Sequence, residues 1–162
     1  MRVRTATPAD ADAIARIYNQ GIDERVATFE TAHRSAGEVR AWFTASHPIV
    51  VVESGDDVER RVIAFASTSV YRPRECYRGI AEFSVYVARE ARGRGAGRMA
   101  MEGLFDAARA AGFRKLVSRV FVENDASRGL LSAVGFREVG TYEKHGTLDG
   151  VWRDAVIVER LL

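Results

Sequence analysis

The chain has 162 residues, of which 47% are hydrophobic and 28% charged, as expected for a globular domain large enough to bury a core. The formal net charge is only +2 and basic residues are spread along the chain, which argues against a nucleic-acid-binding protein. No apolar run approaches the length of a membrane span and no signal peptide is apparent, so we expect no membrane partner. The single cysteine, Cys76, excludes an internal disulfide and favours a cytoplasmic protein, and the three scattered histidines predict no metal site.

Residue periodicity and capping residues predict the secondary structure. Ser35 lies three residues before Glu38, Thr7 precedes Pro8, and Gly135 follows the last predicted helix. In chain order we expect a strand at 2–5, helices at 8–21 and 36–43, a strand at 49–53, a turn at 54–57, strands at 61–70 and 82–87, a helix ending near 111, a strand at 116–122, a helix at 125–134, and strands at 136–144 and 151–159. This order, βααβββαβαββ, predicts an α/β fold around a mixed sheet, with residues 1–162 in one domain.

A basic, glycine-rich turn joins the strand at 82–87 to the helix that follows it. Glycines at every second position leave backbone N–H groups free to point into one concavity, and the helix N-terminus adds partial positive charge. We therefore predict that this turn binds the pyrophosphate of a ligand. The residues assigned to the site are Arg92, Gly93, Arg94, Gly95, Ala96, Gly97 and Arg98.

The turn resembles the signature of the GNAT superfamily of acetyl-CoA-dependent N-acetyltransferases, Gln/Arg-x-x-Gly-x-Gly/Ala, which residues 92–97 match. A second likeness is Asn124, which opens a helix that ends in Gly135-Phe136. The resemblance extends over nearly the whole chain and implies a mostly antiparallel sheet flanked by about four helices. It also implies an enzyme that uses acetyl-CoA as co-substrate and no metal.

The same resemblance implies how the rest of the coenzyme is bound. The backbone of Val85, Tyr86 and Val87 would pair with the pantetheine arm like an added strand, and a donor there could polarise the thioester carbonyl. Asn124 would hydrogen-bond the pantetheine arm, and Ser127 is assigned to the same site. These residues are predicted to hold the acetyl group beside the catalytic centre.

Within the superfamily the chain most resembles phosphinothricin acetyltransferase and its relatives that act on methionine sulfoximine, methionine sulfone or arsinothricin. Those proteins carry a basic-x-basic-x-x-Tyr run before the catalytic glutamate, matched here by Arg72, Arg74 and Tyr77 ahead of Glu82. They also carry an aromatic residue in the early loop, where Phe29 lies; Phe29 and Tyr77 could wall the pocket or belong to the core. The resemblance implies acetylation of the α-amine of a small acidic amino-acid analogue, with a role in detoxification or resistance.

Acetyl transfer to an amine requires a neutral amine, an acceptor for its proton and stabilisation of the developing oxyanion. Glu82 is the candidate general base, since it shares a strand face with Ser84 and Tyr86 and should be partly buried. A structural ion pair between Glu82 and an arginine is the alternative. Arg72 and Arg74 could bind an acidic group through paired hydrogen bonds, or could belong to a solvated basic loop.

The chain departs from the family pattern at Leu131, where many GNAT enzymes carry a tyrosine that serves as general acid for the leaving thiolate. We therefore assign no protein acid, because a thiol with a pKa of about 8.5 is already a fair leaving group. Relatives are often homodimers, and the apolar terminal strand at 156–162 is compatible with a dimer of this chain.

Three alternatives remain open. The first is a GNAT enzyme that acetylates protein N-termini or another amine, and the second is an acyl-CoA sensor without catalysis. The third is a dinucleotide-binding protein, since Gly95, Gly97 and Ala100 have Rossmann spacing and Glu123 follows about 20 residues later. Against the third, the glycines do not follow their strand directly, and only about 60 residues remain after them.

Overall fold

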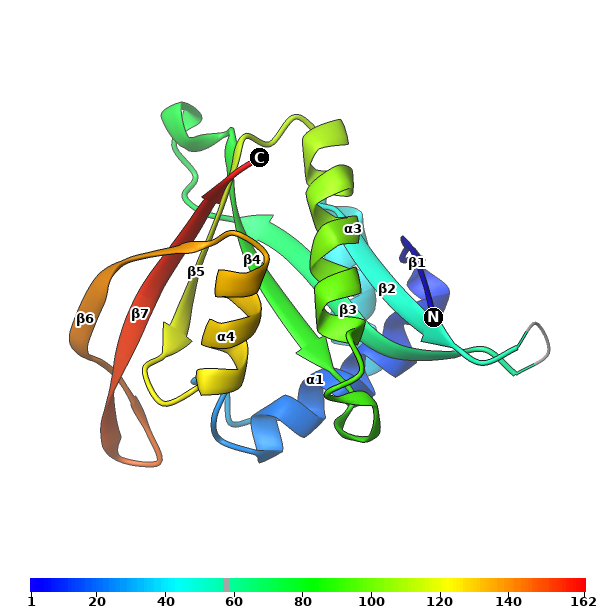
Figure 1. The fold of residues 1–162 in the computed structure, drawn as a ribbon, viewed down its shortest axis with the longest axis horizontal. Helices are drawn as coiled ribbons and strands as arrows, with labels where there is room; N and C mark the ends of the chain where they lie inside the picture. The colour runs from blue at the N-terminus through cyan, green and yellow to red at the C-terminus, as the bar shows by residue number, and fades with distance from the viewer. Residues whose placement is uncertain (57–58) are drawn as a thin grey trace.

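The computed structural model describes residues 1–56 and 59–162 (Figure 1). Its elements are β1 (Arg2–Thr5), α1 (Ala11–Asp23), α2 (Ala36–Ala41), β2 (Ile49–Ser54), β3 (Arg61–Val70), β4 (Ile80–Val87), α3 (Ala96–Ala110), β5 (Lys115–Phe121), α4 (Asp125–Ala133), β6 (Arg137–Leu148) and β7 (Val151–Leu161). The predicted element order is confirmed, with boundaries that differ by a few residues. The predicted turn at 54–57 falls partly outside the described residues, because it includes Asp57. No helix in the described part of the chain has the length and apolarity needed to cross a membrane.

Within the described part of the chain, the strands form one seven-stranded sheet in the order β1-β2-β3-β4-β5-β7-β6. Of these neighbours, β4 and β5 pair in parallel and the other described pairs are antiparallel. The predicted mixed, mostly antiparallel sheet with four α-helices is thus confirmed. A Rossmann unit needs several adjacent parallel strands, so this topology excludes the dinucleotide-binding alternative.

The alternation of side chains along β4 divides the interior between the two faces of the sheet. Phe83 points to one face, where it packs in a core with Leu104 of α3 and Leu131 of α4. Tyr86 points to the other face and packs against a second core that contains Ile14 of α1. Figure 1 shows α3 lying across one side of the sheet and α1 on the other. This strand therefore carries one apolar face and one face available for polar groups.

β4 and β5 pair over only three residues and then separate, as Figure 1 shows. The paired segments are 80–82 of β4 and 115–117 of β5. Beyond them, one edge of β4 bonds to β3 while the other has no strand partner among the described residues. Ala88 donates its N–H to the Ile63 carbonyl of β3 (2.8 Å), so strand alternation directs the N–H and C=O groups of Val85 and Val87 to the open edge.

The capping residues predicted for two helices, Ser35 and Gly135, are confirmed by their hydrogen bonds. The Glu38 N–H donates to Ser35 Oγ (3.2 Å), and the Ser35 N–H donates to Glu38 Oε2 (2.7 Å), which completes the capping box of α2. Gly135 has a φ of +88°, and the Phe136 N–H donates to the Leu131 carbonyl (2.9 Å), as in a glycine-terminated helix. One detail differs: residues 8–10 form a short 3₁₀ turn before α1 begins.

Asp10 joins β1 to the start of α1 and provides a test of the fold. Arg4 donates to both Asp10 carboxylate oxygens at 2.8 Å, and this hydrogen bonding lowers the pKa of Asp10 below its usual value. We expect Asp10→Asn to lower the free energy of unfolding by about 1.5–3 kcal/mol at pH 7, because a buried charged hydrogen bond is lost.

The pH dependence of that loss follows from the direction of the shift. A lowered folded-state pKa stabilises the protein above the unfolded-state value of about 3.9, and the stabilisation disappears as the pH falls through the folded-state pKa. Urea denaturation of both proteins between pH 7 and pH 2 should therefore show their stabilities converging in acid. A difference in unfolding free energy between the two proteins that stays constant from pH 7 to pH 2 would contradict the stabilising role assigned to the ionised Asp10.

Candidate active site

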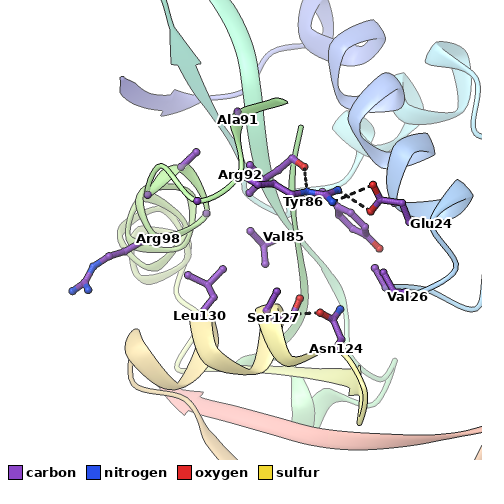
Figure 2. Close-up of a pocket in the computed structure, with 18 residues that line it drawn as sticks. Glu24, Val26, Val85, Tyr86, Ala91, Arg92, Arg98, Asn124, Ser127 and Leu130 are labelled. Carbon is purple, nitrogen blue, oxygen red and sulfur yellow. Dashed lines mark hydrogen bonds and ion pairs between the residues drawn. The ribbon is translucent and has the colours of Figure 1, made fainter. Parts of the chain in front are cut away.

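A cavity of about 360 Å³ lies where the start of α3 meets the open edge of β4 and the end of α1 (Figure 2). The glycine-rich turn forms one wall, and α4 forms the opposite wall. Among the lining residues predicted to bind the coenzyme are Val85, Tyr86, Val87, Arg92, Gly93, Gly95, Ala96, Gly97, Arg98, Asn124 and Ser127. The structure thus gathers most of the predicted coenzyme-binding residues around one space.

The turn has the backbone geometry that an anion-binding site needs. Gly93 and Gly95 have φ values of +71° and +84°, in the left-handed region that favours glycine, and Gly95 caps α3. The first N–H groups of α3, from Ala96 onward, have no acceptor within the helix and carry its positive dipole end. A Cβ on Gly97 would lie 3.0 Å from Leu130 Cδ2, so a larger residue would crowd α4. This arrangement can bind a diphosphate through backbone groups.

The three arginines of the turn are placed differently from one another. Arg92 forms a two-pronged ion pair with Glu24 (3.0 and 2.9 Å), and its Nε donates to the Val87 carbonyl (3.3 Å). Arg98 pairs with Glu102 (2.9 Å), and Figure 2 shows its side chain directed away from the cavity. Arg94 is exposed and is not among the described residues that line the cavity. The positive charge of the site therefore depends mainly on backbone groups and Arg92.

Glu24, at the end of α1, was not anticipated from the sequence. Burial would raise the pKa of its carboxyl, but hydrogen bonds from Arg92 and Arg89 outweigh burial, so the pKa lies below its usual value. The ionised Glu24 thereby fixes Arg92 along the cavity wall. The two residues are 68 positions apart, and no local pattern in the sequence links them.

A narrow slot of about 60 Å³ extends the cavity between the separating strands β4 and β5. Val85, Asn124 and Ser127 line both spaces, so the slot and the cavity form one cleft. Asn124 Oδ1 accepts the Ser127 N–H (3.1 Å), which leaves the Asn124 NH₂ group able to donate into the cleft. Leu131 lines the slot with an apolar side chain. Together with the open edge of β4, these groups can hold an extended, amide-containing chain.

Glu82 lies in β4 beside this slot and is paired with an arginine. Arg119 Nη2 donates to Glu82 Oε1 (2.8 Å), and the two side chains are 29% (Glu82) and 48% (Arg119) exposed. Arg119 belongs to β5 and lines the slot. The arginine partner that the sequence left open as an alternative for Glu82 therefore exists. Arg119 is the one charged residue within the otherwise apolar and serine-containing segment 116–122, but nothing in the sequence links it to Glu82, 37 positions away.

The family follows from comparison with known proteins. A family model described as the acetyltransferase (GNAT) family matches residues 14–136. The chain belongs to the GNAT family. The acetyltransferase family predicted from the glycine-rich turn is therefore confirmed.

Named relatives are similar over nearly the full length. An L-methionine sulfoximine/L-methionine sulfone acetyltransferase of Pseudomonas paraeruginosa is 32% identical, with 97% of this chain and 92% of that protein covered. The structure of a GNAT phosphinothricin acetyltransferase from Sinorhizobium meliloti in complex with AcCoA has a TM-score of 0.88 at 32% identity, covering 99% and 88% of the two chains. A ribosomal-protein-alanine N-acetyltransferase from Brucella melitensis has a TM-score of 0.91 at 30% identity, and both chains are covered completely.

The predicted substrate residues of this GNAT protein lie outside the cleft described above. Arg72 and Arg74 are exposed on the connection between β3 and β4, with Arg74 Cζ 6.0 Å from the centre of the Tyr77 ring. Phe29 packs edge-on against Phe121 of β5, with ring centres 4.7 Å apart, and is 36% exposed. The connection that carries Arg72 and Arg74 leads into β4 at Ile80, two residues before Glu82.

A second cavity, of about 480 Å³, lies over β3 and β4 in this GNAT fold. Its floor is formed by Ser67 and Ser69 of β3 and Ser84 of β4, and its walls include Tyr18 and Trp42. Ser69 lies directly opposite Glu82 in the strand register, and Ser84 shares the face of Glu82. This space was not predicted, because its lining comes from four separate elements.

Tyr86 separates the second cavity from the cleft. Its ring contacts Tyr18 edge-on, with centres 4.9 Å apart, and stacks on Phe65 at 5.5 Å. A Cβ on Gly21 would lie 2.6 Å from the ring, so glycine is needed there for α1 to pass over it. Burial raises the pKa of the Tyr86 phenol well above its usual value, so the side chain stays neutral.

Among the described residues, no cluster of histidine, cysteine or acidic side chains could hold a metal.

Proposed function

We propose that this GNAT enzyme transfers the acetyl group of acetyl-CoA to the α-amine of a small amino-acid analogue with an acidic side group. The observation that carries the proposal is the cleft that runs from the backbone N–H groups of the glycine-rich turn to Arg119, which is paired with the carboxylate of Glu82. The names of the relatives support a small amino-acid analogue as substrate, since they act on methionine sulfoximine, methionine sulfone and phosphinothricin. Of these, phosphinothricin carries an acidic side group, its phosphinate. The catalytic unit proposed is a single domain, residues 1–162.

The cleft fits each part of the coenzyme. The diphosphate would accept hydrogen bonds from the N–H groups of residues 93–98, and Arg92 would add a positive charge. The amides of the pantetheine arm would pair with the open edge of β4 at Val85 and Val87 and accept a bond from the Asn124 NH₂ group. The proposed coenzyme residues are Val85, Tyr86, Val87, Arg92, Gly93, Arg94, Gly95, Ala96, Gly97, Arg98, Asn124 and Ser127, with Arg94 and Arg98 contributing their backbone N–H groups and not their side chains.

The proposed reaction is direct acetyl transfer. The amine nitrogen attacks the thioester carbonyl carbon, a C–N bond forms, and the C–S bond breaks as the thiolate leaves. Glu82 accepts the amine proton, directly or through a water molecule, and an N–H on the open edge of β4 stabilises the oxyanion. The thiolate leaves without a protein acid, since Leu131 offers no proton and a thiol has a pKa of about 8.5.

Substrate turnover tests the proposal. Thiol release from acetyl-CoA should be rapid with L-phosphinothricin, arsinothricin or L-methionine sulfone and slow with a panel of peptides. Activity confined to peptides would favour the second candidate, acetylation of protein N-termini, which the likeness to a ribosomal-protein-alanine N-acetyltransferase supports. Acetyl-CoA binding without turnover of any amine would favour the non-catalytic sensor.

The acidic group of the substrate is assigned to Arg72 and Arg74, with Tyr77 and Phe29 as neighbouring walls. The double variant Arg72→Ala/Arg74→Ala should raise the KM for L-phosphinothricin by about tenfold or more, because charged hydrogen bonds to the phosphinate are lost. The KM for acetyl-CoA should not change. Arg78→Ala is the matched control, since Arg78 lies on the same connection and is 81% exposed. Equal effects on both substrates would assign Arg72 and Arg74 a structural role.

We also propose a cytoplasmic homodimer. Large apolar side chains are exposed on β6 and β7, at Tyr142, Val151, Trp152 and Leu161. Exposed apolar surface of this kind is typical of a protein–protein contact. Cys76 is a free, exposed thiol, which a reducing compartment preserves.

A further inference from the structure

We propose that the Glu82–Arg119 pair is the receptor for the head group of a free amino acid: Arg119 binds the α-carboxylate while Glu82 receives the α-amine. This inference rests on the proposed function and extends it, because Arg72 and Arg74 are assigned to the side group of the substrate. Arg119 thereby becomes a specificity-determining residue. It would select free amino acids over the N-termini of peptides.

The strand register places the two side chains together at the reacting end of the cleft. Glu82 lies opposite Val117 in the parallel β4–β5 pair, and Arg119 follows two residues later on the same face. The pair stands where the strands begin to separate, and Arg119 lines the slot between them. A group bound by Arg119 would therefore lie next to the thioester of a coenzyme held along β4.

The pair has unused hydrogen-bonding capacity. One hydrogen bond of 2.8 Å joins Arg119 Nη2 to Glu82 Oε1. By contrast, Arg128 donates to both carboxylate oxygens of Glu138, at 2.7 and 3.1 Å. A guanidinium has five N–H donors, so Arg119 retains a fork of donors that suits a carboxylate. Both side chains of the pair are partly exposed, and exposed ion pairs contribute little to stability. A ligand can therefore separate Glu82 from Arg119 at small cost.

The head group of an amino acid is complementary to this pair. Its amine and its carboxylate are attached to the same carbon, so they can lie side by side as the carboxylate of Glu82 and the guanidinium of Arg119 do. Insertion exchanges one ion pair for two, and each charge keeps an opposite partner. The N-terminus of a peptide offers the amine but an amide in place of the carboxylate, which leaves Arg119 without a charged partner.

A matched pair of substrates tests the inference: L-methionine sulfone and its α-carboxamide, which differ only in the group assigned to Arg119. We expect the wild-type enzyme to prefer the acid over the amide by about 10- to 100-fold in kcat/KM, as for the loss of a charged hydrogen bond. In Arg119→Leu the acid-to-amide ratio should fall by about 10- to 100-fold from the wild-type ratio. Arg119→Lys, which keeps the charge but not the fork, should give an intermediate ratio. The change in this ratio between wild type and variant isolates carboxylate recognition, because the difference in amine basicity between the two substrates is the same for both proteins and a change in Glu82 itself affects both substrates.

Arg109→Leu is the matched control, since Arg109 is also in a single ion pair and is 46% exposed, close to the 48% of Arg119. It should retain the wild-type ratio. Should Arg119→Leu and Arg119→Lys both bind acetyl-CoA normally and keep the full preference for the acid, the inference is wrong while the proposed function stands. Absence of wild-type activity on L-methionine sulfone, L-phosphinothricin and arsinothricin alike would overturn both.

Discussion

Replacing Glu82 with glutamine is expected to lower kcat by about 10²- to 10⁴-fold and to leave the affinity for acetyl-CoA nearly unchanged. The amide keeps the size of the side chain but cannot accept the amine proton. The coenzyme is proposed to bind through the turn and the open edge of β4, which the substitution does not alter. Thiol release measures the rate, and calorimetric titration measures the affinity.

Asp106→Asn is the control for this change, because Asp106 is an exposed carboxylate on α3 that is paired with an arginine, as Glu82 is. It should retain the wild-type rate. An unchanged rate in Glu82→Gln would remove Glu82 from the mechanism and leave its pairing with Arg119 as a structural ion pair. A large loss of acetyl-CoA affinity would show instead that the substitution had distorted the cleft.

Placing a carboxylate at Gly95 is expected to weaken acetyl-CoA binding by at least about a hundredfold. Gly95 caps α3 beside the N–H groups that would hold the diphosphate, and like charges about 4 Å apart repel by roughly 4 kcal/mol near a protein surface. Calorimetric titration of Gly95→Asp with acetyl-CoA tests this expectation.

Two control variants separate the effects of the added negative charge and of its position from the effect of backbone strain. Gly95→Asn has the same shape as Gly95→Asp but no charge, so it should bind acetyl-CoA distinctly better. Gly112→Asp places the same residue at a left-handed position, with φ of +89°, at the other end of α3 and away from the cleft. Gly112→Asp should lower the thermal stability but bind acetyl-CoA with the wild-type affinity. Equal binding by Gly95→Asp and Gly112→Asp would contradict the assigned diphosphate site.

The order of elements and the glycine-rich turn could be predicted because both depend on neighbours in the sequence. The capping box of Ser35 and Glu38 and the left-handed Gly135 act within one helical turn. The turn between β4 and α3 is likewise local. Its glycines at every second position determine how the backbone N–H groups point.

The placement of the charged side chains could not be predicted in the same way, since their partners are distant in the sequence. Arg92 reaches Glu24 on α1, and Arg119 reaches Glu82 across the β4–β5 pair. The sequence analysis assigned three arginines to the diphosphate site, Arg92, Arg94 and Arg98, but the structure directs only the side chain of Arg92 along the cavity wall. Arg98 is the exception: Glu102, four residues later on the same helix, identifies its partner from the sequence alone.

The second cavity illustrates the same limit. Its serine floor comes from adjacent strands, and its aromatic walls come from α1 and the segment that follows α2. Only the register that places Ser69 opposite Glu82 shows that this space adjoins the proposed base. Periodicity assigns each residue to a face of its own element but gives no distance between elements.

A crystal structure of the acetyl-CoA complex tests the central claim most directly. We predict the diphosphate on the N–H groups of residues 93–98, the pantetheine along Val85 and Val87 in the opening between β4 and β5, and the thioester beside Glu82. A coenzyme bound in the cavity of Tyr18 and Trp42, or with its acetyl group remote from Glu82, would contradict the account.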